Sequence, residues 1–339
     1  MNTMSPSREW HMDLRAPDLH ALGSLMRVCS MAVTPLAQAP MHAVLASDEM
    51  DDAVLCSSRC EFPVRTRFRL PGDHNLIAFM HEAGEGSWVG GEPLASGMLL
   101  LGMPGIPCEM RLGAGTCWSI VLLKGHDLRI ELSRLGYYAQ SVSRRIQRIV
   151  PGEDAESAER MRSLFECIRL RYLEQRRDIN IKGLLDRLRE NLMPDLVSLF
   201  PALPDNARTR HSHYLVLRRV ENFIAANLRR ELRVHDLCEA GSTSERNLRY
   251  IFSDFVGISP NHYLATLRLC EARRLLSEAT PGQHTVRAIA MECGLWDLSR
   301  FAENYRQMFG ELPSDTLNEP RRTPRERHAP YLSPGVQYT

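Results

Sequence analysis

The feature that most constrains this chain is an internal repeat in its last third. Two segments, 237–260 and 289–313, share one order: a short apolar run with a small residue, a tight turn, a residue able to cap a helix, and large apolar residues four and eight positions after the cap. Equivalent positions in the second helices are 53 residues apart, as at Leu248 and Phe301, whereas those in the first helices, such as Leu237 and Ile289, are 52 apart. One extra residue therefore lies in the second turn. Such a repeat predicts two copies of one helical unit.

Each copy predicts two helices joined by a turn. Ser244 and Asp297 stand where an N-cap would satisfy the free amides of the second helix, and Gly257 and Gly310 stand where that helix would end. The large residues expected to face inward are Leu248, Phe252, Phe301 and Tyr305. This is the helix-turn-helix pattern, whose second helix presents its free face to the major groove of DNA. A plain helical hairpin would be favoured for one unit alone, but two units at fixed spacing favour DNA binding.

A single helix is expected between the two units. It opens at Pro260, ends near Thr280-Pro281-Gly282, and has apolar residues at core-facing positions, namely Leu264, Leu267, Ala272, Leu275 and Leu276. A helix of roughly 20 residues is about 30 Å long. That length would set two recognition helices about one DNA turn apart, in successive major grooves.

The distribution of charge also favours the C-terminal part of the chain as the part that binds DNA. Residues 1–207 hold 23 Lys+Arg against 26 Asp+Glu, which gives −3, whereas residues 208–339 hold 19 against 15, which gives +4. An excess of this size permits nucleic-acid binding but does not establish it.

Residues 215–318 resemble the DNA-binding domain of the AraC/XylS family of bacterial transcription regulators. The residues that carry the resemblance are Leu237-Cys238, Ser244 to Phe252, Gly257 to Pro260, Arg268-Leu269, Ala272 to Leu276, Ile289 to Gly294, Phe301, Tyr305, Phe309-Gly310 and Pro313. The N-terminal 200 residues resemble that family's sensor and dimerisation region, which implies a cupin-like β-barrel followed by helices. Gly90 to Leu132 and Leu298 to Phe309 are similar to the branch that contains the ethanolamine-utilisation regulator.

The resemblance and the helix positions together give expected DNA contacts. On the first recognition helix, Arg246, Arg249 and Tyr250 lie two, five and six positions after the cap, and we expect the two arginines to bind guanine edges or phosphates. Arg249 could instead pair with Glu245. In the second unit the corresponding face departs from the family pattern, because Glu303 would repel phosphate or accept from a cytosine amino group. The full predicted set is Ser244, Arg246, Asn247, Arg249, Tyr250, Ser299, Arg300, Glu303 and Arg306.

The N-terminal region predicts strands. From His42 to Leu132, short apolar runs are separated by glycine and proline, which is typical of a small antiparallel sandwich or barrel. Uncharged residues alternate with arginines along one strand, so one of its faces should be buried and the other solvated. The uncharged residues are Val64, Thr66, Phe68 and Leu70, and the arginines are Arg65, Arg67 and Arg69.

After Pro151-Gly152 the period becomes helical. One apolar stripe is Met161, Leu164, Phe165, Ile168 and Tyr172, and a second is Ile181, Leu184, Leu185, Leu188, Leu192, Leu196 and Leu199. We expect Pro194 to bend or interrupt the second helix. Packing within the domain is favoured over a dimer seam.

These patterns predict an α+β chain of two domains. We expect a cupin-like effector-sensing and dimerisation domain over 1–204, a linker over 205–213, an all-α domain with two helix-turn-helix units over 214–320, and a flexible tail over 321–339.

Composition excludes several classes of protein. No run of about 18 uninterrupted apolar residues occurs, so no membrane-spanning helix is expected. The segment Leu25 to Ser47 reads poorly as a signal peptide, because Arg27 and two prolines interrupt it. Nine scattered cysteines suggest reduced thiols and a cytoplasmic location.

The residues that could bind a metal do not assemble into a site. His74, His81 and Glu82 lie in the strand region without a His-x-His pair, and the pair His211 and His213 falls in the linker. Cys56 and Cys60 lack a second pair of ligands at zinc spacing. No metal, cofactor or catalytic residue is therefore expected.

Two functions remain. The first is a ligand-responsive DNA-binding transcription regulator, expected to act as an activator, with promoter DNA, RNA polymerase and a small-molecule effector as partners, a homodimer as one assembly, and no membrane contact. The alternative is a cupin-type metal-dependent enzyme or metal-binding protein with an accessory DNA-binding module.

Overall fold

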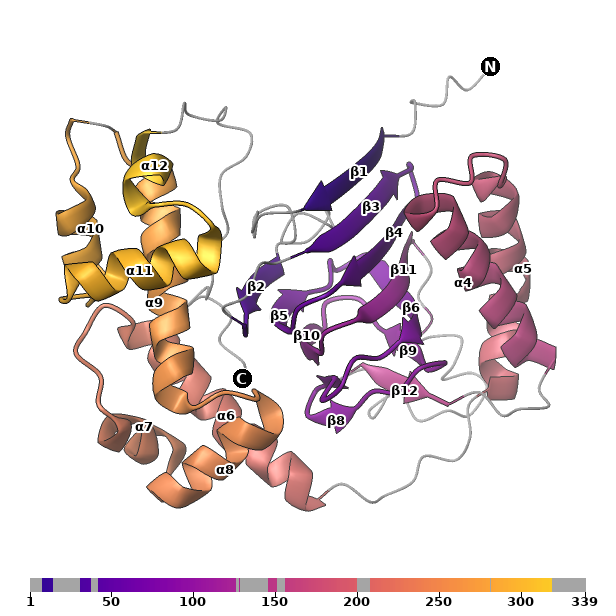
Figure 1. The fold of residues 1–339 in the computed structure, drawn as a ribbon. Coiled ribbons are helices and arrows are strands. Elements are labelled where there is room, and N and C mark those ends of the chain that lie inside the picture. The colour runs from indigo at the N-terminus through magenta and orange to yellow at the C-terminus, as the bar shows by residue number, and fades with distance from the viewer. Residues whose placement is uncertain are drawn as a thin grey trace.

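The computed structural model describes residues 8–14, 31–37, 42–125, 128, 146–150, 156–199, 208–280 and 282–318. A β-rich N-terminal region with two covering helices lies beside an all-helical C-terminal region (Figure 1). The expected α+β class is confirmed at this level.

Two antiparallel sheets build the N-terminal region. The larger has seven strands in the order β1 (Arg8–Leu14), β3 (Ala43–Glu49), β4 (Ala53–Cys60), β11 (Thr116–Lys124), β6 (His74–Glu82), β9 (Leu99–Gly102) and β12 (Gln147–Ile149). The smaller has five in the order β2 (Met31–Pro35), β5 (Val64–Arg69), β10 (Pro107–Leu112), β7 (Trp88–Val89) and β8 (Glu92–Pro93).

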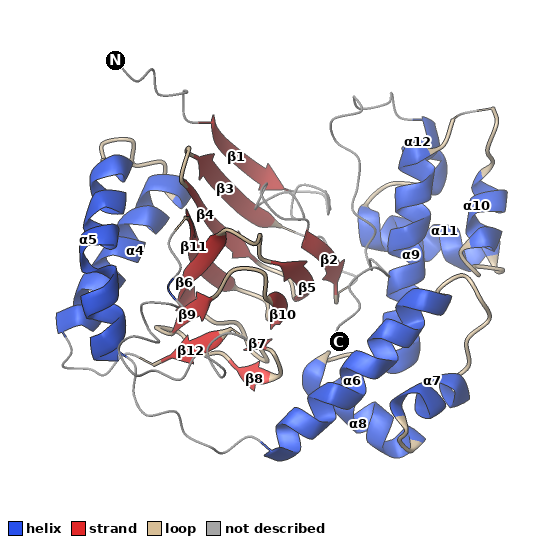
Figure 2. Cartoon of the chain, turned by 180° about the vertical axis from the view of Figure 1, so that it is seen from behind, coloured by secondary structure: helices blue, strands red, loops and turns tan. Residues whose placement is uncertain are grey.

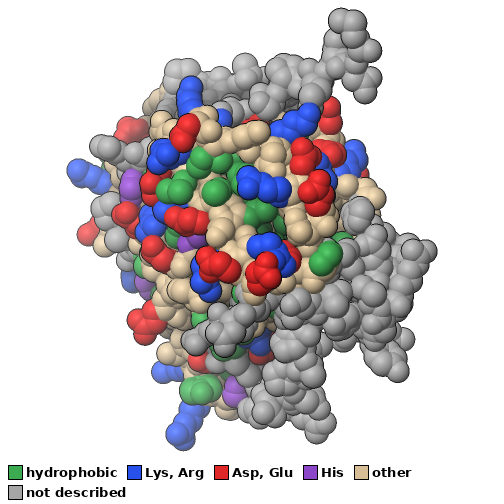
Figure 3. All heavy atoms as spheres, turned by 90° about the vertical axis from the view of Figure 1, so that its right-hand side faces the viewer, with side chains coloured by type: hydrophobic (Ala, Val, Ile, Leu, Met, Phe, Trp, Pro, Cys, Tyr) green, Lys and Arg blue, Asp and Glu red, His purple; other side chains and the backbone are tan. Residues whose placement is uncertain are grey.

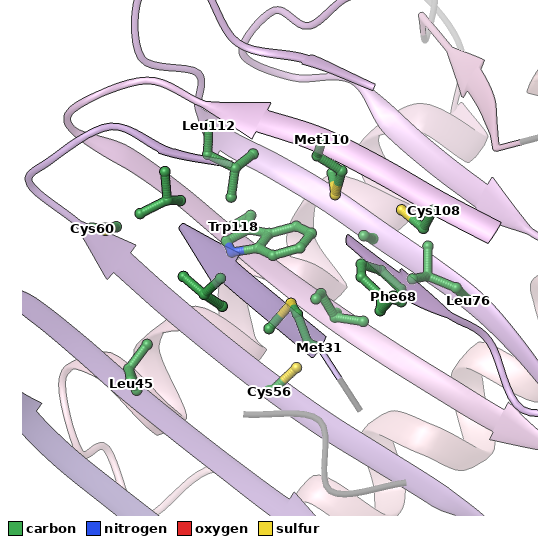
Figure 4. Packing of buried hydrophobic residues seen from close by; sticks show 14 of the residues in the cluster. Met31, Leu45, Cys56, Cys60, Phe68, Leu76, Cys108, Met110, Leu112 and Trp118 are labelled. Atoms are coloured by element: carbon green, nitrogen blue, oxygen red, sulfur yellow. The ribbon is translucent and has the colours of Figure 1, made fainter. Parts of the chain in front are cut away.

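The two sheets share an apolar core. Figure 4 shows Trp118 of the larger sheet near Phe68 and Met110 of the smaller one. Trp118 is 3% exposed, and its indole Nε1 donates a hydrogen bond of 2.5 Å to Ser58 Oγ. The indole can be buried because this hydrogen bond satisfies its one polar group. Large side chains such as these fill the space between the sheets.

The predicted cupin-like barrel is not confirmed. Within the described residues no strand is common to both sheets, so the arrangement is an open sandwich. Strands β7 and β8 have two residues each, too few to carry a hydrogen-bonded ladder around from one sheet to the other.

Strand β5 follows the predicted alternation on one face and departs from it on the other. Val64, Thr66 and Phe68 are buried, as expected. Arg65, however, is 1% exposed, so the prediction of a solvated face is wrong at this position. The reason is tertiary: helices of the C-terminal region cover this side of the smaller sheet, as described below.

Helix α4 (Glu156–Leu173) lies on the outer face of the larger sheet, and α5 (Ile181–Leu199) packs against α4 (Figure 2). The rings of Phe79 on β6 and Phe165 on α4 are stacked with centroids 5.8 Å apart. Leu184, Leu185 and Leu188 are also buried, which agrees with packing inside the domain. Interruption at Pro194 is not seen, because α5 continues through this exposed residue to Leu199.

The C-terminal region contains seven helices within the described residues. They are α6 (Arg208–Asn227), α7 (Val234–Gly241), α8 (Glu245–Phe255), α9 (Pro260–Glu278), α10 (Val286–Glu292), α11 (Leu298–Phe309) and α12 (Pro313–Asn318). Residues 208–213, expected in the linker, form the first turns of α6. The tail at 321–339 lies outside the described residues. Across the described ranges, no helix combines the length and apolar character needed to cross a bilayer.

Candidate nucleic-acid interface

Helix α8 is the predicted recognition helix of the first unit. Its N-cap is Ser244, in extended conformation at φ −75° and ψ 157°, and Ser244 Oγ accepts a hydrogen bond of 3.3 Å from the amide of Asn247. Leu248 and Phe252 are fully buried, as expected, together with Ile251 and Phe255. The cap therefore sets where the helix begins, and the apolar residues set which face turns away from solvent.

The opposite face of α8 is exposed and carries most of the predicted DNA contacts. Arg246, Arg249 and Tyr250 are exposed, and Tyr250 keeps 59% of its surface in solvent. Arg249 pairs with Glu245 one turn earlier, the alternative considered from the sequence. Asn247 is half-buried, and its Nδ2 donates a hydrogen bond of 2.8 Å to Thr243 Oγ1 in the preceding turn.

Helix α11 repeats the design in the second unit. Asp297 is the N-cap and its Oδ1 accepts a hydrogen bond of 3.0 Å from the amide of Arg300. Phe301 and Tyr305 are buried, and the helix ends at Gly310, whose φ of 76° suits glycine. The predicted contact residues Ser299, Arg300, Glu303 and Arg306 are all exposed.

The two turns differ in one respect that the repeat did not reveal. Gly294 adopts a φ of 71° in the second turn, whereas in the first turn Ser242, at φ 50°, takes the left-handed conformation. Gly241, aligned with Gly294 in the repeat, is instead a close-packing residue: a Cβ there would lie 2.9 Å from the Val220 side chain. The equivalence between the turns is therefore approximate.

Helix α9 connects the units as expected from its sequence. It begins at the N-cap Ser259, whose Oγ accepts from the His262 amide at 3.2 Å, and has 19 residues. Its length is about 28 Å at the usual rise per residue. Residues on several of its sides are buried, because α9 packs against α8 in one unit and against α10, α11 and α12 in the other. Figure 1 shows it running from one unit to the other.

A buried ionic cluster joins helices α6 and α9 to the smaller sheet. Glu221 on α6 is fully buried, and its carboxylate accepts hydrogen bonds from Arg65 Nε and Nη2, each at 3.1 Å, and from the Tyr263 hydroxyl at 2.9 Å. Arg67 pairs with the same carboxylate. Burial raises the pKa of Glu221, but the two guanidinium groups outweigh burial and hold its pKa at about 2. Glu221 is therefore ionised, and its charge is balanced across the interface.

Glu109 on β10 extends this cluster toward the start of α6. It accepts from Arg65 Nη2 at 2.8 Å and from the Tyr214 hydroxyl at 3.0 Å. Burial raises the pKa of Glu109, yet Arg67 and Arg65 lower it overall.

The sheet also contacts the end of the first recognition helix. Trp88 is fully buried, and its Nε1 donates a hydrogen bond of 2.6 Å to the carbonyl of Phe255, the last residue of α8. Arg111 Nε donates to the Val256 carbonyl at 3.2 Å, and the Arg65 guanidinium lies 4.5 Å from the Trp88 ring centroid. The sheet thus holds the C-terminal end of α8 and leaves its N-terminal half exposed.

Sequence reasoning missed this interface. Three arginines on one strand face and a tryptophan between glycine-rich turns were the available signal, but Glu221 lies 156 residues after Arg65. Nothing in the local pattern of either segment identifies the other as its partner.

The metal candidates do not converge. His74 Nδ1 lies 2.7 Å from Asp73 Oδ1, and His81 Nε2 lies 2.9 Å from Ser119 Oγ. In the described part of the chain, no group of three or more His, Cys, Asp and Glu side chains is arranged to hold a metal ion. Cys56 and Cys60 are buried thiols, and burial raises the pKa of Cys60 to about 12.

His81 belongs to a polar chain that resembles a hydrolase triad in its order of groups. Its Nδ1 lies 3.6 Å from Glu166 Oε2, while its Nε2 meets Ser119. Ser119 is 0% exposed, between the larger sheet and α4, so a substrate cannot reach its hydroxyl. Burial lowers the pKa of His81 to about 4, and the neutral ring serves to attach α4 to the sheet.

Comparison with known proteins agrees with the geometry of the C-terminal region. A protein family described as a helix-turn-helix domain matches residues 237–319. The XylDLEGF operon transcriptional activator of Pseudomonas putida is 39% identical over 101 residues, which are 30% of this chain and 32% of that protein. The HTH-type transcriptional activator RhaR of Pectobacterium carotovorum subsp. carotovorum (strain PC1) is 34% identical over 119 residues, which are 35% of this chain and 40% of that protein. The chain thus spans about a third of the length of these relatives.

A solved structure is also similar to part of this chain. A probable AraC family transcriptional regulator from Rhodopseudomonas palustris CGA009 is 40% identical, with 32% of this chain and 98% of that chain covered and a TM-score of 0.30. The C-terminal region of the present chain carries an AraC-type helix-turn-helix domain, which implies sequence-specific DNA binding. The metal-dependent enzyme considered as an alternative finds no support among these relatives, and the similarity to the ethanolamine-regulator branch stays a prediction.

Proposed function

Since the C-terminal region is an AraC-type helix-turn-helix domain, we propose that the whole chain is an effector-responsive transcription activator without catalytic activity. The observation that carries the proposal is the pair of capped units, α7–α8 and α10–α11, joined by the single helix α9. In this proposal the region before the linker senses a small molecule, and the region after it binds promoter DNA.

The first unit supplies most of the sequence preference. Arg246 and Arg249 lie on the exposed face of α8, where bidentate contact with guanine is worth about 1–3 kcal/mol each. The ion pair between Arg249 and Glu245 does not prevent Arg249 from binding guanine, because both side chains are more than half exposed and such a pair contributes less than about 1 kcal/mol. Asn247 and Tyr250 flank these arginines, and Ser244 fixes the start of the helix.

The second unit binds more weakly. Ser299, Arg300 and Arg306 provide donors on the exposed face of α11, but Glu303 brings a carboxylate to the middle of that face. A carboxylate among phosphates is repelled, unless it accepts from a cytosine amino group.

The effector site that fits best is a cavity between α4 and α5. Its volume is about 360 Å³, within the range of small-molecule sites. It is lined by Glu156, Glu159, Arg160, Met161, Ser163, Leu164, Cys167, Leu184, Arg187, Leu188, Asn191 and Asp195. Figure 3 shows apolar side chains surrounded by charged ones on this side of the molecule. A compact, partly apolar molecule matches that lining.

A continuous set of contacts leads from this cavity to the first recognition helix, α8. Helix α4 packs on β4, β11 and β6, the two sheets share one core, and the smaller sheet holds α6 and the end of α8 through Glu221 and Trp88. An effector that favours one arrangement of α4 can therefore bias the position of the first unit, provided that its affinity differs between the arrangements.

RNA polymerase and a second copy of the chain complete the proposed assembly. An activator acts by recruiting polymerase, and a dimer would bind two sets of half-sites, which sedimentation of the purified chain would detect.

The function is tested by selecting DNA from a random-sequence pool with the full chain and measuring affinity at several salt concentrations. We expect a selected duplex whose affinity falls steeply with salt. Arg246→Ala should weaken and relax its recognition, whereas Arg162→Ala, an exposed arginine on α4, should change neither. Failure to select any salt-sensitive duplex would overturn the proposal.

A further inference from the structure

The most exposed large apolar side chain in the described part of the chain is Trp296, at 65%. It lies in the turn of the second unit, directly before the cap Asp297 of α11. An indole exposed to this degree leaves roughly 150 Å² of apolar surface in water. Single exposed apolar side chains are common on protein surfaces, so it is the position of Trp296 beside the candidate recognition helix that indicates a contact with a partner.

The fold of the turn does not require Trp296. In the first unit the equivalent residue is Thr243, which is half-buried and accepts the hydrogen bond from Asn247. In the second unit the turn is closed by the backbone, with Gly294 at φ 71° and the Leu295 amide donating to the Ala290 carbonyl at 2.9 Å. Local structure therefore explains the threonine and leaves the tryptophan without a structural role in its turn.

Trp296 lies next to the start of the exposed face of α11. It directly precedes the N-cap Asp297, and like Trp296 the residues Ser299, Arg300 and Glu303 in the first turns of the helix are exposed. Recognition helices contact base edges mainly through their N-terminal residues. Trp296 precedes those residues, so it would be among the first side chains of the second unit to reach the groove.

DNA is the occupant expected at the start of a recognition helix. Arg300 and Arg306, exposed on α11, attract a polyanion, and the carboxylates of Asp297 and Glu303 offset part of that attraction. Glu303 weakens polar recognition on this face, and an apolar contact would supply a second source of specificity beside the donors Ser299, Arg300 and Arg306. In the major groove the apolar feature of a base pair is the thymine methyl group.

We propose that Trp296 contacts a thymine methyl group in the major groove and gives the second unit a preference for thymine at that base pair. The inference rests on the proposed DNA-binding function and adds a residue and a base class to it. Because the contact is apolar, it contributes affinity without releasing counterions.

The test uses a duplex selected by the full chain and derivatives in which one thymine at a time in the second half-site is replaced by deoxyuridine, which lacks the methyl group. One replacement should weaken wild-type binding about fourfold, the effect of one buried methyl group. Trp296→Ala should bind the parent duplex roughly tenfold more weakly, lose sensitivity to that replacement, and keep the wild-type salt dependence. Trp296→Phe should retain part of the sensitivity.

Two controls keep the outcomes separate. Leu312→Ala removes another exposed apolar side chain, 41% exposed and off the α11 face, and should bind like wild type. Circular dichroism should show unchanged folding of Trp296→Ala, because the side chain packs little in the free protein.

Failure of the wild-type chain to bind any duplex would refute the proposed function itself. Normal binding and unchanged deoxyuridine sensitivity in Trp296→Ala would refute the thymine contact alone. The contact would equally be refuted if Trp296→Ala bound DNA normally but lost activation in a purified transcription reaction, which would assign Trp296 to polymerase.

Discussion

Replacing Glu221 with glutamine tests the buried cluster between the smaller sheet and helices α6 and α9. The change keeps the size of the side chain and removes its charge, so Arg65 and Arg67 lose the carboxylate that compensates them. The pKa of Glu221 falls from 4.5 to about 2 in the folded chain. A shift of about 2.5 units corresponds to roughly 3 kcal/mol, at the lower end of the cost of breaking a buried ion pair.

The expected loss can be measured by urea unfolding followed by tryptophan fluorescence, since Trp88 reports on this interface. With a denaturant dependence of about 2 kcal/mol per molar, the midpoint of that transition should fall by about 1.5 M. The control is Glu278→Gln, which removes a half-exposed partner of Arg274 and should shift the midpoint by less than about 0.5 M.

The pKa of Glu221 also determines how its contribution to the free energy of unfolding changes with pH. Because the folded pKa of Glu221 lies below the unfolded one, its contribution is complete above about pH 4.5 and is lost as pH falls toward 2. A Glu221→Gln midpoint equal to that of wild type at pH 7 would refute the assignment of this cluster as a stabilising contact.

Three further predictions concern the site and its surroundings. Glu303→Gln should strengthen binding to the selected duplex several-fold at low salt and make it more sensitive to salt, and weaker binding would instead indicate a cytosine contact. His81, whose pKa is lowered to about 4 chiefly by burial, should show no ring titration between pH 5 and 8 by NMR, and a titration near pH 6.5 would contradict its burial. Because the folded pKa lies below the unfolded one, the stability that the neutral ring supports should fall as pH drops from about 6.5 to 4. Leu164→Glu, at the cavity between α4 and α5, should abolish the response to any effector recovered in a promoter screen while leaving effector-free DNA affinity unchanged, and a retained response would place the effector elsewhere.

The C-terminal architecture was predictable because its determinants are local. A cap residue fixes where each recognition helix begins, and apolar residues four and eight positions later fix the buried face, so Ser244, Leu248, Asp297 and Phe301 carried the information within one short segment. Helices α4 and α9 were predictable for the same reason, because the apolar period that marks each of them lies within one segment of the chain.

Features that depend on distant contacts were not predictable. The open sandwich differs from the expected barrel because closure depends on the lengths of β7 and β8, and the burial of Arg65 depends on Glu221, which is far away in sequence. Trp296 was missed for a different reason: it lies one position before the cap, outside the helical period from which the contact residues were chosen.

The central claim is that α8 and α11, held by α9, enter successive major grooves on one face of a duplex. The most direct measurement is a hydroxyl-radical and guanine-methylation footprint of the full chain on its selected duplex. The account predicts two protected major-groove segments about 10 base pairs apart on the same side of the helix, with protection of the first lost in Arg246→Ala and protection of the second weakened but retained in Trp296→Ala. A single protected segment, or two on opposite sides of the duplex, would contradict it.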